Sequence, residues 1–301
     1  MPADLAAAHY KNFLYATTAR RWHALWCRWA PDGALKESFH AERSFTPTEA
    51  RDAVDMGVIY HYGGEKGTVS EGPRCGPWRI TEAEHSAGDG LLHPSSADMT
   101  TLMLPASGPS AWCMKRSAVG EQPCAVELFL HHGEHLRMSA GVIHTAAGEL
   151  MQLSAIREDA RGPFPGAFWS GSTEAATSDG AGLAAALASA GAPVGAKGTG
   201  HAITADLQQR ALSGVEWSAT RMANAVAEKD VVLICPDSIA VVGTRKRAAG
   251  ERLRSACAWW PPAGSEDGSA GSGAPTHLYT IEATWDEQGA LVEVTYLVFT
   301  A

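Results

Sequence analysis

The sequence predicts a mainly β protein built from two antiparallel β-barrels in tandem, with a helix ahead of the first barrel and a short helix opening the second. Short apolar runs alternate with Gly, Pro and Asp at intervals of about ten residues, which is typical of an antiparallel meander. A stretch rich in Ala, Gly and Ser divides the chain at residues 171–200. Closing each meander into a barrel removes exposed strand edges, and a barrel of about eight strands can hold one small ligand.

The first predicted element is a helix within residues 4–29. Asp4 is a suitable N-cap, and apolar residues recur near the helical period as far as Leu25. The sequence does not fix where this helix ends, because the aromatic residues near its C-terminal end fit either a continued helix or the start of the first strand. These residues are Trp22, Trp26 and Trp29.

Two consecutive hairpins are predicted between Cys124 and Asp159. Strand-type runs over 125–131, 136–144 and 150–158 are separated by short polar turns. One turn pattern occurs three times in the chain: a Gly, suited to positive φ, is followed by one residue and then by a Leu that opens a strand. These repeats favour repeated hairpins, and they lie at 33–35, 148–150 and 289–291.

The second half is also predicted to be rich in strands. Residues 171–200 are interpreted as a flexible linker, because such a composition cannot supply a packed core. A short helix is expected over 204–212, and a disordered loop over 261–275. The predicted domains are therefore residues 1–170, the linker 171–200, and a smaller barrel over 201–301. The strands expected in that barrel are 215–222, 231–235, 239–244, 252–260, 277–285 and 291–299.

Composition and charge exclude several classes of function. There are 24 basic against 33 acidic side chains, and the net charge of −9 argues against a nucleic-acid surface. The sequence contains no apolar run of about 18 residues, so no membrane-spanning helix is predicted. The first fifteen residues lack the basic region and the continuous apolar run of a signal peptide. Six cysteines without a CxxC pair predict neither a zinc site nor a disulfide framework. We expect a reducing compartment, the cytoplasm or a plastid stroma, and nucleotide-binding glycine motifs are lacking.

Several segments carry a resemblance to a known family, and they are residues 29–33, 37–39, 43–45, 90–96, 99–100, 108–113, 126–132 and 156–159. In these segments the sequence is similar to tandem lipocalin-like proteins of unknown function, found chiefly in photosynthetic lineages, which share their barrel type with the phycobiliprotein chromophore lyases. The resemblance covers about residues 25–170 and implies a cupped, lipocalin-like barrel suited to an apolar or tetrapyrrole-like ligand. It carries over no catalytic residues.

Two arginines on neighbouring strands are candidate anchors for a ligand. If Met138 and Val142 face outward to a covering element, alternation turns Arg137 and Arg157 toward the barrel interior. A guanidinium there would pair with a ligand carboxylate such as a bilin propionate. The alternative is that both arginines face solvent, or that they pair with Glu127 across the strands.

Histidines and cysteines supply weaker candidates. His93 lies in a loop with several hydrogen-bonding groups, but a catalytic Ser–His pair would need a third orienting group that the sequence does not identify, and helix capping by Ser95 or Ser96 is the simpler interpretation. Two cysteines flank a basic loop and suit a lyase, although buried packing explains them too. Four histidines crowd one hairpin and would suit a metal or haem iron, but turn histidines are usually solvated, so no metal site is predicted. These residues are Cys113, Cys124, His131, His132, His135 and His144.

The sequence therefore predicts the binding of a hydrophobic or amphipathic small molecule, a pigment or a tetrapyrrole or carotenoid, in the N-terminal barrel. The second barrel is expected to be structural. Alternatives are a chromophore lyase or a cofactor-free isomerase or cyclase on the same barrel, and a non-enzymatic assembly factor. The partners expected are the small molecule and an acceptor or photosynthetic protein. The predicted ligand-binding residues are Arg137, Arg157, Glu158, Trp112, His93 and Phe129.

Overall fold

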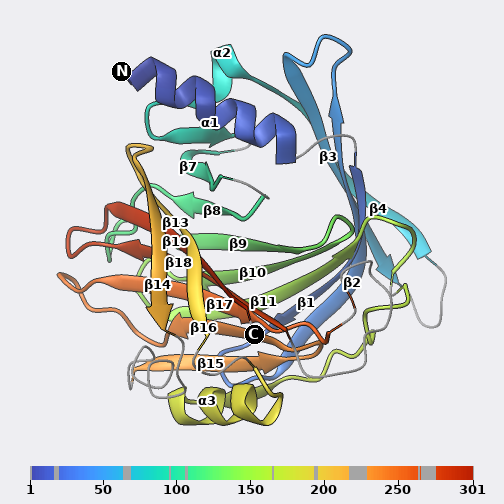
Figure 1. The fold of residues 1–301 in the computed structure, drawn as a ribbon, viewed down its shortest axis with the longest axis vertical. Coiled ribbons are helices and arrows are strands. Elements are labelled where there is room, and N and C mark those ends of the chain that lie inside the picture. Colours follow the sequence, from blue (N-terminus) through green and yellow to red (C-terminus); the bar gives the residue numbers. More distant parts are fainter. Residues whose placement is uncertain are drawn as a thin grey trace.

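The chain folds into two antiparallel sheets in a computed structural model (Figure 1). An eleven-stranded sheet has the order β4-β3-β2-β1-β11-β10-β9-β8-β7-β6-β5, and an eight-stranded sheet has the order β12-β15-β16-β17-β18-β19-β13-β14. The structure describes residues 2–16, 20–63, 69–94, 96–105, 108–164, 166–192, 196–216, 229–263, 265 and 276–300. The mainly β architecture expected from the sequence is confirmed.

The first sheet curls into a nearly closed barrel, because β1 pairs with β11 at the other end of the meander. Its two edges, β4 and β5, are joined in the chain by the short helix α2 (Glu82–His85), and helix α1 (Pro2–Ala16) precedes the barrel. The strands are β1 (Arg20–Trp29), β2 (Leu35–Pro47), β3 (Ala53–Gly63), β4 (Val69–Thr81), β5 (Ser86–Ala87), β6 (Gly90–His93), β7 (Ser96–Met103), β8 (Ser110–Met114), β9 (Cys124–His132), β10 (Leu136–His144) and β11 (Leu150–Asp159).

The second sheet is formed by the last third of the chain and one short strand before it. Helix α3 (Gly180–Ser189) begins at Asp179, whose side chain accepts a hydrogen bond from the Gly182 backbone, and it buries Leu183 and Leu187 against the sheet. The strands are β12 (Ala176–Ser178), β13 (Lys197–Thr204), β14 (Gln209–Glu216), β15 (Asp230–Cys235), β16 (Ile239–Thr244), β17 (Leu253–Trp259), β18 (His277–Trp285) and β19 (Leu291–Thr300).

Several predicted elements are corrected. The helix expected within 4–29 ends at Ala16, and Trp22 to Trp29 belong to β1. The helix expected over 204–212 is a hairpin instead, since β13 ends at Thr204 and β14 starts at Gln209. Its connecting turn holds Leu207 at a φ of 65°. Local periodicity was misleading here because strand pairing with β19 decides the conformation of β13.

The stretch interpreted as a linker carries β12, α3 and the start of β13. Its alanines fill α3, because Ala has the highest helix propensity. Most of the predicted strand over 215–222 and most of the loop over 261–275 lie outside the described residues. The division into units 1–170 and 201–301 stays a prediction.

The two sheets pack face to face on one hydrophobic core. Met138 and Val142 on the outer face of the barrel contribute to it, together with Val241 and Trp259 of the second sheet. The packing is close, since a Cβ on Gly243 would lie 2.9 Å from Val142. The covering element that the sequence required over Met138 and Val142 is therefore the second sheet.

Candidate functional site

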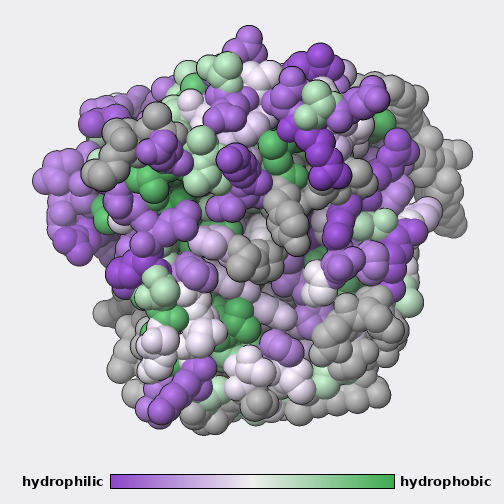
Figure 2. All heavy atoms as spheres, turned by 45° about the horizontal axis from the view of Figure 1, so that its top comes forward, coloured by the Kyte–Doolittle hydropathy of each residue, from purple (hydrophilic) through white to green (hydrophobic). Residues whose placement is uncertain are grey.

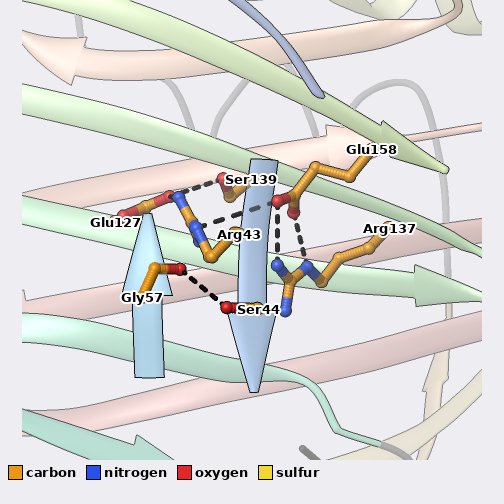
Figure 3. Close-up of polar contacts among 7 residues, drawn as sticks. All are labelled: Arg43, Ser44, Gly57, Glu127, Arg137, Ser139 and Glu158. Atoms are coloured by element: carbon orange, nitrogen blue, oxygen red, sulfur yellow. Dashed lines mark hydrogen bonds and ion pairs between the residues drawn. The ribbon is translucent and has the colours of Figure 1, made fainter. Parts of the chain in front are cut away.

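The inner face of the barrel carries a cluster of five polar side chains that contact one another (Figure 3). Alternation along each strand places them there, while Met138 and Arg157, which are neighbours of cluster members on β10 and β11, face the second sheet. The cluster draws on four strands, β2, β9, β10 and β11. Its members, called the inner cluster below, are Arg43, Glu127, Arg137, Ser139 and Glu158.

Arg137 and Glu158 form a bidentate ion pair at the centre of this cluster. The two residues stand opposite each other on β10 and β11. Arg137 Nε donates to Glu158 Oε2 at 2.5 Å, and Nη2 donates to Oε1 at 2.8 Å. Glu158 is fully buried, and the two hydrogen bonds from Arg137 compensate for the loss of water around its carboxylate. Burial lowers the pKa of Arg137, and Glu158 opposes this shift.

Arg43 makes fewer hydrogen bonds than Arg137. Its Nη2 donates to Glu127 Oε1 at 3.0 Å, and the same oxygen accepts from Ser139 at 2.7 Å. Arg43 Nε lies 3.8 Å from Glu158 Oε1, but neither Nε nor Nη1 has a hydrogen-bond partner, although the residue is only 1% exposed. Burial alone would lower the pKa of Arg43, but Glu127 and Glu158 outweigh it and raise this pKa. Arg43 is therefore a buried cation with two unused donors.

Aromatic rings enclose both guanidinium groups. The Arg137 guanidinium lies 4.4 Å from the Trp22 ring centroid, and that of Arg43 lies 5.3 Å from the Trp26 centroid. Both guanidinium groups lie 5.4 Å from the Phe129 centroid, and Trp112 packs edge-on against this ring. Cation–π contacts of this kind stabilise desolvated cations.

Two neutral histidines border the cluster. His93 packs edge-on against Trp112 with ring centroids 4.6 Å apart, and burial lowers its pKa. His131 lies on the inner face of β9, where burial, and then the charges of Arg137 and Arg20, lower its pKa to about 3. The arginines thus supply the positive charge of the chamber.

Helix α1 covers one end of the barrel, above β5 to β7 (Figure 1). His9 Nε2 accepts a hydrogen bond from the Met103 backbone at 2.8 Å, and burial lowers the His9 pKa to about 4. The Tyr10 hydroxyl donates to the backbone carbonyls of Asp52 and Ile80. Figure 2 shows that the outer surface of the molecule at this end is mostly hydrophilic, with scattered apolar patches.

Side chains fill most of the chamber beneath α1. A cavity of about 20 Å³ remains beside Arg137, bounded among others by Phe13 of α1 and by Phe45 and Trp112. This volume suffices for roughly one water molecule. Phe13 of α1 therefore forms part of the wall of this cavity, next to the inner cluster.

The structure brings together five of the six predicted ligand-binding residues. Arg137, Glu158, Trp112 and Phe129 share the inner face, and His93 touches Trp112. Arg137 faces the interior as expected.

The expectation that Arg157 also faces the interior is wrong. Arg157 stands opposite Met138 in the β10–β11 register and therefore faces the second sheet. There it is fully buried and donates to Asp237, to the Ser172 backbone and to Cys27. Neighbouring residues on a strand point to opposite faces, so Arg157 and Glu158 cannot both enter the chamber.

Arg43 is a central member of the inner cluster that was not predicted from the sequence. It lies within the segment 43–45 that carries the family resemblance, between Ala41 and Phe45 on the apolar face of β2. A charged residue within an alternating apolar row was the available signal. Its partner Glu127 was considered only as a cross-strand partner for the other arginines.

The histidines of the 124–144 hairpin do not converge. His131 faces the chamber, whereas His132 contacts Tyr279 and Ser265 between the sheets and His144 contacts the Thr244 carbonyl. Across the described part of the chain, no three His, Cys, Asp or Glu side chains are placed to hold a metal ion. Cys113 and Cys124 are buried, which raises the pKa of both thiols and fits a packing role.

Comparison with known proteins places the chain in a family. A model for the N-terminal part of DUF3598, a domain of unknown function, matches residues 6–163, which include most of α1 and the whole barrel. The chain belongs to the DUF3598 family. The resemblance to a family of unknown function is therefore confirmed. The search of curated proteins finds no match.

Solved structures also match this chain, with the following two among them. One is a DUF3598 protein of unknown function from Nostoc punctiforme PCC 73102, at 12% identity and a TM-score of 0.59, over 97% of this chain and 98% of that one. The other is the S-type phycobiliprotein lyase CpeS from Guillardia theta, at 13% identity and a TM-score of 0.32, over 53% of this chain and 96% of that one. At 12% identity, the match to the Nostoc punctiforme protein shows a shared fold alone.

In the part of this chain that the structure describes, no helix is long and apolar enough to cross a membrane.

Proposed function

We propose that the DUF3598 barrel binds an amphipathic small molecule with an acidic or carbonyl group, a pigment of the tetrapyrrole class, at its inner cluster. The observation that carries this proposal is Arg43, a buried guanidinium with two donors that lack partners. Leaving such donors unpaired costs roughly 1–3 kcal/mol each. A ligand oxygen would satisfy them, and the surrounding rings would bury the apolar part of the ligand.

Arg43 is the anchor and Arg137 its support. Arg137 directs Nε and Nη2 to Glu158, so it has less to offer a ligand. Glu158 in turn lies 3.8 Å from Arg43 Nε and helps to hold the Arg43 side chain in place. A ligand carboxylate would therefore meet a preorganised guanidinium in a setting of low polarity, where a charge-assisted hydrogen bond is strong.

A pigment reaches this cluster only if α1 moves. The cavity of about 20 Å³ is far smaller than typical ligand pockets of about 300–1,000 Å³. Phe13 projects into the chamber from α1, and the helix is held over the barrel by His9 and Tyr10. In the proposed mechanism, the ligand replaces Phe13 and tilts or lifts the helix.

The test is a titration with haem, biliverdin, protoporphyrin and a carotenoid, followed by absorbance and tryptophan fluorescence. We expect saturable binding of at least one tetrapyrrole, weakened about tenfold or more by Arg43→Met. The matched control is Arg79→Met, which removes an exposed arginine paired with Asp55 in the same sheet. Phe13→Ala should strengthen or accelerate binding, since it removes part of the obstruction.

The proposal is wrong if no tetrapyrrole binds even to Phe13→Ala, or if Arg43→Met and Arg79→Met bind equally well. Thermal melts of every variant confirm that it is folded before it is titrated. A lyase or isomerase would add covalent chemistry to the same chamber, so transfer of a bound pigment to an acceptor protein is measured only after binding is established.

A non-enzymatic assembly factor is the second candidate function. The observation in its favour is the chamber filled by side chains beneath α1. It predicts that Phe13→Ala fails to bind any of the pigments, while the folded protein still binds a photosynthetic protein partner.

A further inference from the structure

A second, larger cavity lies on the outer face of the same barrel. It measures about 240 Å³ and lies between strands β1 to β3 and the Pro163–Phe164 segment. Four ionisable side chains border it, and none of them takes part in the inner cluster. The outer groove, as it is called below, is lined by His23, His40, Glu42, His61 and Phe164, together with Ala24, Ala41 and Pro163.

Strand register brings these side chains to one face. His23 on β1 stands opposite Glu42 on β2, and His40 on β2 stands opposite His61 on β3. His40 and Glu42 alternate along β2 with Ala41 and Arg43, which face the chamber. Both His40 and Glu42 therefore point away from the chamber. Phe164 closes the groove over His40, with ring centroids 5.8 Å apart.

Glu42 is the centre of the groove. Its Oε1 lies 3.9 Å from His23 Nδ1 and 3.6 Å from His61 Nε2, whereas its other oxygen is 3.3 Å from Arg21 Nη1. Both ring nitrogens of His61 are shielded from solvent and make no hydrogen bond. Burial lowers the pKa of His40, which favours the neutral ring. The groove therefore presents one carboxylate oxygen beside imidazoles, which accept hydrogen bonds when neutral.

The chemistry of these groups excludes three kinds of ligand. An anion would be repelled by Glu42, and a purely apolar molecule would desolvate Glu42 Oε1 without offering it a hydrogen bond. A metal ion does not fit the side chains as they stand, because no three of the described His, Cys, Asp and Glu residues are placed to hold one. A cation with several N–H donors and a short apolar body suits every group in the groove.

We propose that the outer groove binds an organic ammonium ion. The ammonium donates to Glu42 Oε1 and to the imidazole nitrogens of His23 and His61, and its carbon chain packs on Phe164. The aromatic face also attracts the cation. The net charge of −9 favours the approach of a cationic ligand. This site is independent of the inner cluster, since it uses the opposite faces of β1 and β2.

The experiment uses putrescine as the probe, with calorimetry and the NMR signals of the histidine ring protons as readouts. We expect putrescine to bind saturably and to shift the ring-proton signals of His23 and His61. The neutral 1,4-butanediol and the anionic succinate should not bind. Glu42→Gln keeps the shape but removes the charge, and should weaken binding about tenfold or more. Glu37→Gln is the matched control, because Glu37 lies on the same strand, is exposed and pairs with Arg28 instead.

Binding of succinate, or equal affinity in Glu42→Gln and Glu37→Gln, would overturn the proposal, as would saturation by Zn²⁺ without any response to putrescine. Arg43→Met should leave putrescine binding unchanged, because Arg43 lies on the other face of β2. The pigment titration and the putrescine titration test different faces, so failure of one does not decide the other.

Discussion

Strands β1 and β2 carry two different sites on their two faces. The inner face places Arg43 among aromatic rings, where it is 1% exposed, while the outer face places Glu42 beside histidines, where its side chain is 26% exposed. On the inner face every carboxylate is paired at hydrogen-bond distance, whereas on the outer face the contacts of Glu42 Oε1 are 3.6 to 3.9 Å long. Burial explains the difference, since a desolvated charge requires close partners and a half-solvated one does not.

The comparison predicts that charge removal on the inner face costs stability and that the same change on the outer face costs binding alone. The largest effect is expected for Glu158→Ala, which leaves Arg137 without its bidentate partner and removes the more distant of the two carboxylates beside Arg43. Loss of one partner of a buried ion pair destabilises by about 3–5 kcal/mol. Urea denaturation measures this loss, and Glu42→Ala is the control, with an expected cost of about 0–1 kcal/mol. Similar losses in the two variants would contradict the assignment of the two faces.

Arg157→Met separates structural from ligand-binding arginines. The variant leaves Asp237 without its buried cation between the sheets, and we expect a loss of about 3 kcal/mol. Pigment affinity should stay within about twofold of the wild-type value, in contrast to Arg43→Met. A tenfold loss of pigment affinity in folded Arg157→Met would instead show that the second sheet takes part in binding.

Acidification should weaken the contact of α1 with the barrel. The folded pKa of His9 is about 4, below its unfolded value of 6.5, so the unfolded state binds a proton that the folded state excludes. The His9 contribution is therefore complete above pH 6.5 and is lost progressively as the pH falls from 6.5 toward 4, by about 3 kcal/mol in all.

The variant His9→Gln isolates this effect, because an amide oxygen can still accept from Met103 without titrating. The difference in unfolding free energy between wild type and His9→Gln should shift in favour of the variant between pH 6.5 and 4.5. A constant difference over this range would mean that His9 takes up its proton without displacing α1.

The smallest effect on stability is expected for Glu42→Gln. This change removes a charge that stays partly solvated, so its cost is about 0–1 kcal/mol. Thermal melting should therefore remain close to the wild-type curve while putrescine binding weakens about tenfold or more. A large drop in melting temperature would show that Glu42 holds β1 to β3 together, and would assign it to structure.

The hairpins between Cys124 and Asp159 were predictable because their alternation and turns are local. The three repeated turns also have the expected form, with Gly33, Gly148 and Gly289 all at positive φ. The orientation of Arg137 followed from the covered Met138. The orientation of Arg157 did not, since it depends on which of two adjacent residues the register assigns to the chamber. A shift of one residue reverses the face of every side chain in a strand.

Sequence patterns were sufficient for the β architecture, the repeated turns and the inward orientation of Arg137, because strand periodicity and glycine conformation depend on neighbours in the chain. The tertiary structure alone revealed the pairing of Arg43 with Glu127, the helix α1 over the barrel, and the meeting of His23, Glu42 and His61. These contacts join residues that are distant in sequence, and they form only when the sheet has curled and its register is set.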